Sequence, residues 1–201
     1  LVFASDEIRK SVLENIAKIG LSKLGALFSV CSSEYTDRTV SGVFFEHIAH
    51  RILERGGTFT CTSLEENESD KRSTMSITLG PTEHGARVFK EDGDILGMKD
   101  QYCVPLVPNF PAFDAAYYPY LFQMTIRKEH PVTSMHKALQ KVSPFPHLTS
   151  ADFQTKVKKC FLIFVVPSEI ANEWTKKQHF VGDRMEQRLQ KHIKQFVLPL
   201  D

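Results

Sequence analysis

The stretch VPNFPAFDAAYYPYLFQMTIRKEHP, residues 107–131, carries the most informative pattern in this chain. A single acid, Asp114, precedes an apolar segment that ends in basic residues. The two-residue period of a strand divides this segment into two faces. One face holds Leu121, Gln123, Thr125 and Arg127, and the other holds Phe122, Met124 and Ile126. We expect the apolar face to be core and the polar face to be a candidate site.

The polar residues of this stretch suit a divalent cation. Such a hard cation takes oxygen ligands, and the Asp114 carboxylate, the Gln123 amide oxygen and the Met124 carbonyl would supply three if their strands are neighbours. Glu46, from an upstream helix, would add a fourth directly or through water. A bound metal would activate water and stabilise charge on a phosphodiester oxygen. Alternatively, Gln123 and Thr125 hydrogen-bond within the sheet and Asp114 caps a turn.

Length and composition indicate a soluble globular domain. The chain has 201 residues, of which 42% are hydrophobic and 24% charged, enough for one buried core. It contains no apolar run long enough to span a membrane. The four cysteines are scattered without a Cys-x-x-Cys pair, which favours a reducing compartment over a zinc ribbon or a disulfide framework. Because the chain opens on Leu1, we expect it to be a domain of a longer protein.

The net charge of +1 is unevenly distributed. Residues 1–100 sum to −4 and residues 101–201 to +5. Clustered basic residues of the second half are candidates for contacting nucleic-acid phosphates. They are Arg127, Lys128, Lys156, Lys158, Lys159, Lys176 and Lys177. The alternative is a set of solvated helix faces.

Hydrophobic periodicity predicts a mixed α/β fold with helices packed on a sheet. The expected helices cover residues 5–20, 21–30, 38–55, 134–142, 168–174 and 183–192, with one more between residues 147 and 159. The expected strands cover residues 58–64, 73–79, 87–90, 101–105, 113–117, 121–127, 160–166 and 193–198. Residues 1–37 are predicted to be a helical extension or linker, and residues 38–201 the α/β domain.

Two further groups are predicted to be structural. His47 and His50 lie near Glu46, but no cysteines or acids stand at zinc-ligand spacing around them, so both are assigned to the helix surface or rim. Trp174 is expected to pack its ring on the sheet, although stacking on a base is an alternative.

Several segments, in order along residues 38–200, resemble the C-terminal domain of Crinkler effectors and of retrotransposon-hot-spot proteins. The matching segments are FEHIAHRILERGG from Phe45, NFPAFD ending at Asp114, LFQMT from Leu121, His130-Pro131, and FLIFVVP from Phe161. The resemblance implies a restriction-endonuclease-like core, in which helices flank a mixed central β-sheet. It also implies an upstream ATPase module and a secreted effector that acts in the host nucleus.

The nuclease signature of that superfamily is a helical Glu, an Asp, and Glu-x-Lys on the next strand. By position, Glu46 is the helical acid and Asp114 the metal ligand, while Gln123 and Thr125 stand where Glu and Lys are expected. Gln keeps an oxygen but loses a charge, and Thr cannot supply the positive charge that stabilises the transition state. Lys128 or His130, just beyond the strand, would have to supply that charge.

Besides supplying a positive charge, His130 could act as a general base. Alternatively, it is a structural turn residue before proline. The resulting expectation is a virulence effector whose C-terminal hydrolase, an endodeoxyribonuclease, depends on magnesium or manganese. The alternative is a catalytically inactive, nuclease-like domain that binds DNA or a host nuclear protein. A domain for protein interaction or self-association, with an acidic and a basic half, is a third possibility.

Overall fold

The structure is a computed structural model that describes residues 11, 38–65, 71–82, 85–90, 100–106, 110, 112–141 and 160–200. The helices predicted at residues 5–20, 21–30 and between 147 and 159 lie outside the described residues. The same holds for the extension predicted at residues 1–37, apart from Ser11.

One large mixed sheet forms the centre of the molecule, with strand order β2-β1-β10-β8-β6-β5-β4-β3. A separate two-stranded sheet pairs β7 with β9. The strands of the large sheet are β1 (Gly57–Ser63), β2 (Thr74–Leu79), β3 (Arg87–Phe89), β4 (Cys103–Pro105), β5 (Ala115–Tyr117), β6 (Tyr120–Met124), β8 (Phe161–Pro167) and β10 (Lys194–Leu200). The short sheet contains β7 (Val132–Thr133) and β9 (Phe180–Val181), and the helices are α3 (Arg38–Glu54), α4 (Met135–Lys141), α6 (Ser168–Ala171) and α7 (Arg184–His192).

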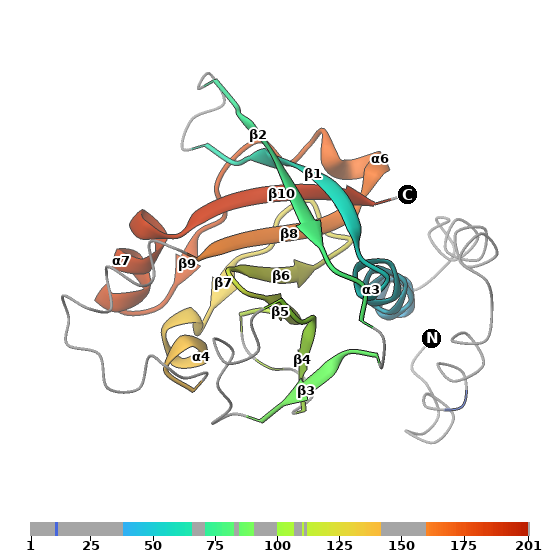
Figure 1. Cartoon of the computed structure of the whole chain (residues 1–201). Coiled ribbons are helices and arrows are strands. Elements are labelled where there is room, and N and C mark those ends of the chain that lie inside the picture. Colours follow the sequence, from blue (N-terminus) through green and yellow to red (C-terminus); the bar gives the residue numbers. More distant parts are fainter. Residues whose placement is uncertain are drawn as a thin grey trace.

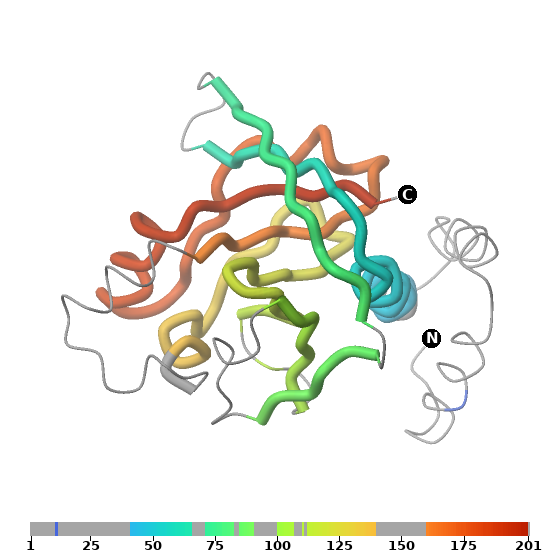
Figure 2. The backbone as a smooth tube through the Cα atoms, in the orientation of Figure 1, coloured from blue at the N-terminus to red at the C-terminus, as the bar shows by residue number. Residues whose placement is uncertain are grey.

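The middle of the large sheet is parallel and its flanks are mainly antiparallel. β6, β8 and β10 run parallel to one another, whereas β1 pairs antiparallel with β10 and β5 pairs antiparallel with β6. Figures 1 and 2 show β8 and β10 crossing the middle of a strongly curled sheet, with the β1–β2 hairpin at one side and β3 and β4 at the other. The α/β class predicted from the sequence is therefore confirmed.

Helix α3 packs on one face of the curled sheet. Its buried side chains Phe45, Ala49 and Leu53 belong to the same apolar cluster as Phe122 of β6. The helix gives way to β1 at the predicted glycines, where Gly56 has a φ of 71°. A Cβ on Gly56 would lie 2.6 Å from the Leu79 carbonyl oxygen, so the backbone of the hairpin passes too close for any side chain.

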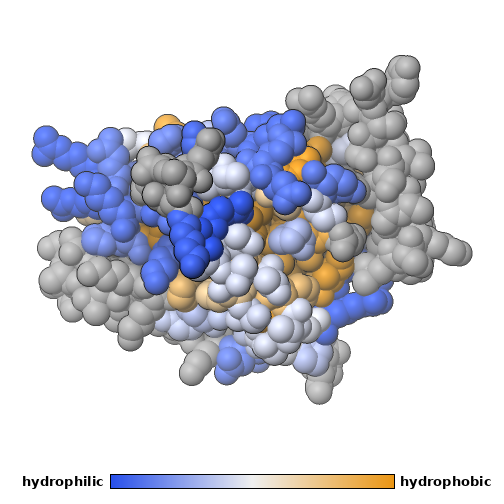
Figure 3. Space-filling view, turned by 90° about the horizontal axis from the view of Figure 1, so that it is seen from above, coloured by the Kyte–Doolittle hydropathy of each residue, from blue (hydrophilic) through white to orange (hydrophobic). Residues whose placement is uncertain are grey.

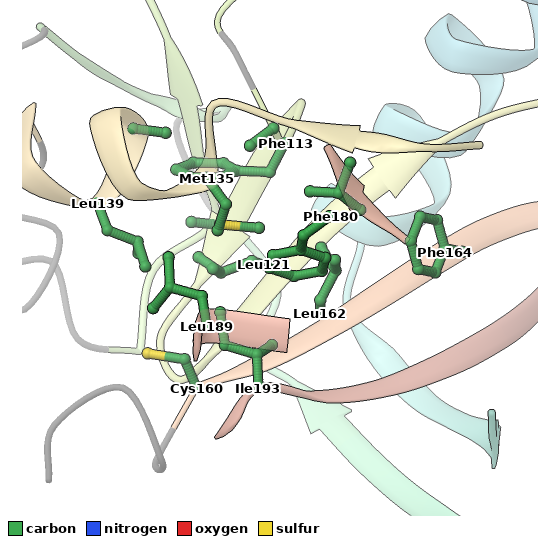
Figure 4. Close-up of a cluster of buried hydrophobic side chains, with 14 of the residues drawn as sticks. Phe113, Leu121, Met135, Leu139, Cys160, Leu162, Phe164, Phe180, Leu189 and Ile193 are labelled. Atoms are coloured by element: carbon green, nitrogen blue, oxygen red, sulfur yellow. The ribbon is translucent and has the colours of Figure 1, made fainter. Parts of the chain in front are cut away.

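Helices α4 and α7 cover the opposite face. Met135 and Leu139 of α4 and Leu189 of α7 meet Leu121 and Phe164 of the sheet in a second buried cluster, and Figure 4 shows these side chains converging between the helices and the strands. Leu121 and Phe122 thus pack on opposite faces of β6, so both faces contribute to the core. On the face predicted to be a candidate site, Leu121 and Thr125 are buried and Gln123 is half-buried.

Some element boundaries differ from the predicted ones. β6 ends at Met124 rather than at residue 127, because the Thr125 hydroxyl accepts a hydrogen bond from the Arg127 N–H at 3.1 Å and closes a turn. α6 ends at Ala171 rather than at residue 174. The pairing of β7 with β9 was not predicted, since two-residue strands leave no periodic signal.

Candidate functional site

Asp114 directly precedes β5 and lies beside the C-terminal end of the neighbouring strand β6. Its N–H donates to the Phe122 carbonyl at 2.7 Å, which continues the antiparallel pairing of the two strands. Its carboxylate oxygen Oδ2 accepts two hydrogen bonds of 2.7 Å, one from the Met124 N–H and one from the Gln123 Nε2. The strands are therefore neighbours, and three of the predicted metal ligands, Asp114, Gln123 and Met124, are brought together.

The Met124 carbonyl is on the same side of β6 as Asp114. Within a strand, the N–H and C=O of one residue point to the same side, and the Met124 N–H points to Asp114. The next residue, Thr125, directs its N–H the other way, to the Val165 carbonyl of β8 at 3.0 Å. A carboxylate, an amide and a carbonyl thus gather at the C-terminal end of β6.

Asp114 is partly buried, and the loss of water around its carboxyl makes the ionised form costly. The pKa of its carboxyl is raised from 3.8 to about 7, first by desolvation and then by the nearby Glu46 carboxylate. The Met124 N–H and the His50 ring oppose this shift and lower the pKa. Glu46, on α3, is therefore close enough to act electrostatically on Asp114, as the fourth predicted member of the site. Its own side chain is half exposed.

Tyr102 is a member of this region that the sequence prediction missed, and it contacts His50, which was predicted to be a residue of the helix surface or rim. The His50 Nδ1 and the Tyr102 hydroxyl are 2.8 Å apart, and the His50 Nε2 lies 3.9 Å from the Glu46 carboxylate one helical turn away. Tyr102 is fully buried, and its pKa is raised first by desolvation and further by carboxylates that include Asp114. The i, i+4 spacing of Glu46 and His50 was the available signal for their proximity.

The residues expected to replace the missing lysine are engaged elsewhere. The Thr125 hydroxyl holds the turn after β6. Lys128 is exposed and pairs with Glu173 at 2.7 Å. The His130 N–H donates to Gln178, and its ring lies 6.5 Å from the ring of Phe164. The pKa of His130 is lowered by desolvation and then by Arg127, which keeps its imidazole neutral at physiological pH.

Two basic residues, Arg127 and Lys128, form a loop just after the end of β6, which we call the basic loop. The Trp174 Nε1 donates to the Arg127 carbonyl at 3.1 Å, and Lys128 pairs with Glu173, so this loop lies against the segment after α6. That segment continues into Lys176, which forms a β-bridge with Glu65. Arg127, Lys128 and Lys176 are exposed and Lys177 is partly exposed. Four of the predicted phosphate contacts are thus near one end of the sheet, while Lys156, Lys158 and Lys159 lie outside the described residues.

Trp174 packs as predicted. It is buried, and its ring centroid lies 4.9 Å from that of Phe164 on β8. The alternative of stacking on a base is wrong for this conformation, because the indole is only 1% exposed.

The residues around Asp114 carry the oxygen types that magnesium or manganese prefers, namely the Asp114 carboxylate, the Gln123 amide oxygen and the Met124 carbonyl. In this conformation, however, the groups that face the carboxylate are N–H donors, the Gln123 Nε2 and the Met124 N–H. A cation would relieve the electrostatic cost of the partly buried Asp114 carboxylate beside Glu46. The fit depends on neutral donors, because the described part of the chain contains no cluster of three or more His, Cys, Asp or Glu side chains able to hold a metal ion. For Gln123 to be a ligand, its amide oxygen has to face the ion.

The described cysteines offer no alternative chemistry. Cys61, Cys103 and Cys160 are buried thiols. Burial raises the pKa of Cys61 and Cys160 to about 12 and that of Cys103 to about 11. These thiols are protonated at physiological pH and are poor nucleophiles and poor metal ligands.

Comparisons with protein families, with curated proteins and with solved structures return no match to this chain. Within the residues that the structure describes, none of the helices combines the length and the apolar character needed to cross a membrane.

Proposed function

We propose that this chain is a nuclease-like domain that binds DNA through its basic loop and hydrolyses phosphodiester bonds at Asp114 with magnesium or manganese. The observation that carries the proposal is the partly buried Asp114 carboxylate, which the Gln123 amide and the Met124 N–H hold at the end of β6 and whose pKa desolvation and the neighbouring Glu46 raise to about 7. Strongly shifted carboxyls of this kind concentrate at functional sites. The restriction-endonuclease-like core and the Crinkler-type effector role are part of the same proposal and rest on the sequence resemblance.

Each residue has a defined part in this proposal. Asp114, Glu46, the Gln123 amide and the Met124 carbonyl would hold the cation. The cation would supply Lewis-acid stabilisation of the phosphate and an activated water. Arg127, Lys128 and Lys176 would hold the DNA backbone by charge.

His50, rather than Lys128 or His130, would be the nitrogen group beside the carboxylates. Its Nε2 lies 3.9 Å from the Glu46 carboxylate, and its ring is held by the contact of Nδ1 with the Tyr102 hydroxyl at 2.8 Å. In this role it would partly compensate for Thr125, which stands where the signature has a lysine. His50 acts through Glu46 and Asp114 and is a positioning residue.

Plasmid cleavage tests the proposal. Supercoiled DNA is incubated with the 201-residue chain and Mg²⁺ or Mn²⁺, and nicked circles are expected from the wild type. Asp114→Asn keeps an acceptor for the Met124 N–H but removes the charge, so nicking should be lost. Asp100→Asn is the matched control, because Asp100 is exposed and has a φ of 61°, which asparagine tolerates. Absence of nicking with both metals, or equal nicking by Asp114→Asn, would overturn the nuclease proposal.

A second candidate function, DNA binding without cleavage, is favoured by one specific observation. Thr125 is committed to its turn and Lys128 to Glu173, so neither brings a positive charge to Asp114. Under this alternative the basic loop still binds DNA, and Asp114→Asn leaves binding unchanged.

A further inference from the structure

Within the part of the chain that the structure describes, β2 is an edge of the large sheet, and its own sequence lacks the residues that usually protect an edge. Its six residues, Thr74–Leu79, contain no charge, proline or glycine. Within the described residues, β1 is the only strand that pairs with it. Natural proteins protect edge strands with lysines, prolines, bulges or very short strands. The other edge follows that rule, since β3 has three residues and carries the exposed Arg87.

The hydrogen-bonding groups on the open side of β2 can be assigned from the hairpin. The Ser63 N–H donates to the Ser73 carbonyl at 2.8 Å, so this pair and every second pair after it are hydrogen-bonded. The intervening pairs, Thr62 with Thr74, Thr60 with Ser76 and Thr58 with Thr78, are non-hydrogen-bonded. The backbone N–H and C=O groups of Thr74, Ser76 and Thr78 therefore point away from β1, toward the open edge.

The same three residues carry a uniform outer face. Thr74, Ser76 and Thr78 are exposed, and their cross-strand partners on β1 are all threonines. The Thr58 and Thr78 hydroxyls lie 3.2 Å apart, as expected for a close, non-hydrogen-bonded pair. Threonine and serine have nearly neutral hydropathy. Figure 3, which views the molecule from above, shows pale surface bordered by both hydrophilic (blue) and hydrophobic (orange) groups.

This edge is complementary to itself. Two copies of β2 placed antiparallel about a two-fold axis at Ser76 pair Ser76 with Ser76 of the second copy and Thr74 with Thr78. All the outward N–H and C=O groups then meet, which gives about six hydrogen bonds. The outer face remains hydroxyl against hydroxyl, and Met75 lies opposite Ile77 on the inner face.

Charge does not oppose this pairing. Lys71, before β2, falls opposite Pro81 of the second copy in this register and not opposite a like charge. Arg72 is folded back, where its Nη2 donates to the Trp174 carbonyl at 3.1 Å. The closed, two-fold arrangement is also the commonest symmetry of protein dimers.

We infer that β2 is a dimerisation edge, through which two copies of this chain join their sheets by antiparallel β2–β2 pairing centred on Ser76. This surface lies on a different strand from the Asp114 site, and the inference does not depend on the proposed nuclease activity.

Sedimentation equilibrium tests the inference with the 201-residue chain at concentrations up to about 100 µM, where a six-residue strand interface is expected to associate. The wild type should be a dimer. Ser76→Lys places two like charges directly opposite each other at the axis and should be a monomer. Thr60→Lys adds the same charge to the same face, one strand away from the edge, and should remain a dimer.

Ser76→Cys gives a direct readout of register. Directly opposite residues of a hydrogen-bonded antiparallel pair have Cα atoms about 5.5 Å apart, within disulfide range. Under mild oxidation, Ser76→Cys should form a covalent dimer, whereas Thr60→Cys should not. A monomeric wild type, a dimer that survives Ser76→Lys in a variant with wild-type circular dichroism, or equal cross-linking of both cysteine variants would overturn the inference.

Discussion

The Asp114 carboxyl is a group whose ionisation opposes folding. In the unfolded chain it ionises near pH 4, whereas in the folded chain its pKa is about 7. The folded state therefore binds a proton more tightly, and the contribution of Asp114 to stability falls as pH rises from about 4 to about 7.

Asp114→Asn should remove this dependence. We expect the variant to be more stable than the wild type by about 2 to 4 kcal/mol at pH 8, and the difference to disappear near pH 4. Urea denaturation at several pH values, without divalent cations, measures both free energies of unfolding. Asp100→Asn, at an exposed position, should track the wild type. If the difference in the free energy of unfolding between Asp114→Asn and the wild type does not change with pH, the Asp114 carboxyl ionises in the folded protein as easily as in the unfolded chain, and the expectation is contradicted.

At the scale of elements, two buried glutamines join β10 to the segment before β9. The Gln195 Oε1 accepts from the Gln178 N–H at 2.8 Å, and the Gln195 Nε2 donates to the Gln178 carbonyl at 3.0 Å. The Gln178 side chain in turn accepts from the His130 N–H at 2.8 Å. The segment around Gln178 is not a strand paired with β10. The Gln195 side-chain amide therefore makes the two hydrogen bonds to the Gln178 backbone that a neighbouring strand would otherwise make.

Gln195→Leu should break this connection. The variant leaves the buried N–H and C=O of Gln178 without partners, which costs about 2 to 4 kcal/mol. Chemical denaturation followed by circular dichroism measures the loss. Gln187→Leu is the control, because Gln187 is exposed on α7 and its replacement should change stability by less than about 0.5 kcal/mol. Equal effects of both variants would contradict the role of Gln195.

The elements that the sequence predicted are those with a strong local pattern. The helical spacing of Phe45, Ala49 and Leu53 predicted α3, and the alternation of polar and apolar residues predicted β1 and β2. An element that is buried on one side only has a periodic pattern of apolar residues, which the sequence shows directly. β6 was predicted too long, since the turn that ends it depends on one hydroxyl, that of Thr125. Strands buried on both faces, such as β8, show no alternation and carry no information about their partners.

The site was only partly predictable for the same reason. The sequence placed Asp114 beside Gln123 and Met124, because neighbouring strands joined by a short turn pair predictably. It could not place Tyr102 beside His50, since that contact joins two elements 52 residues apart. Nor could it show that Lys128 would be paired with Glu173.

At the scale of the whole molecule, the distribution of charge predicts how DNA would bind. The exposed Arg127 and Lys128 follow the end of β6, and the exposed Lys176 belongs to the segment that contacts them through Glu173 and Trp174. Each phosphate contact releases counterions, so affinity should fall steeply with salt.

Replacing Arg127, Lys128 and Lys176 together by glutamine should weaken DNA binding. The slope of log K against log salt should decrease in magnitude by about two to three, since each lost phosphate contact removes about 0.9. Fluorescence anisotropy of a labelled duplex at several salt concentrations measures the slope. Arg87 of β3, Lys90 directly after β3 and Lys137 of α4 are exposed basic residues, and their joint replacement by glutamine controls for net charge. Equal slopes for the two triple variants would contradict a role for the loop.

Trp174 is the only tryptophan of the chain, and its position makes it a built-in optical reporter. Its indole N–H is bonded to the backbone of the basic loop, and its ring rests on Phe164 of the central sheet. Indole emission depends on the polarity and hydrogen bonding around the ring. A ligand that displaces the loop from the sheet would change the wavelength of that emission without any label attached to the protein.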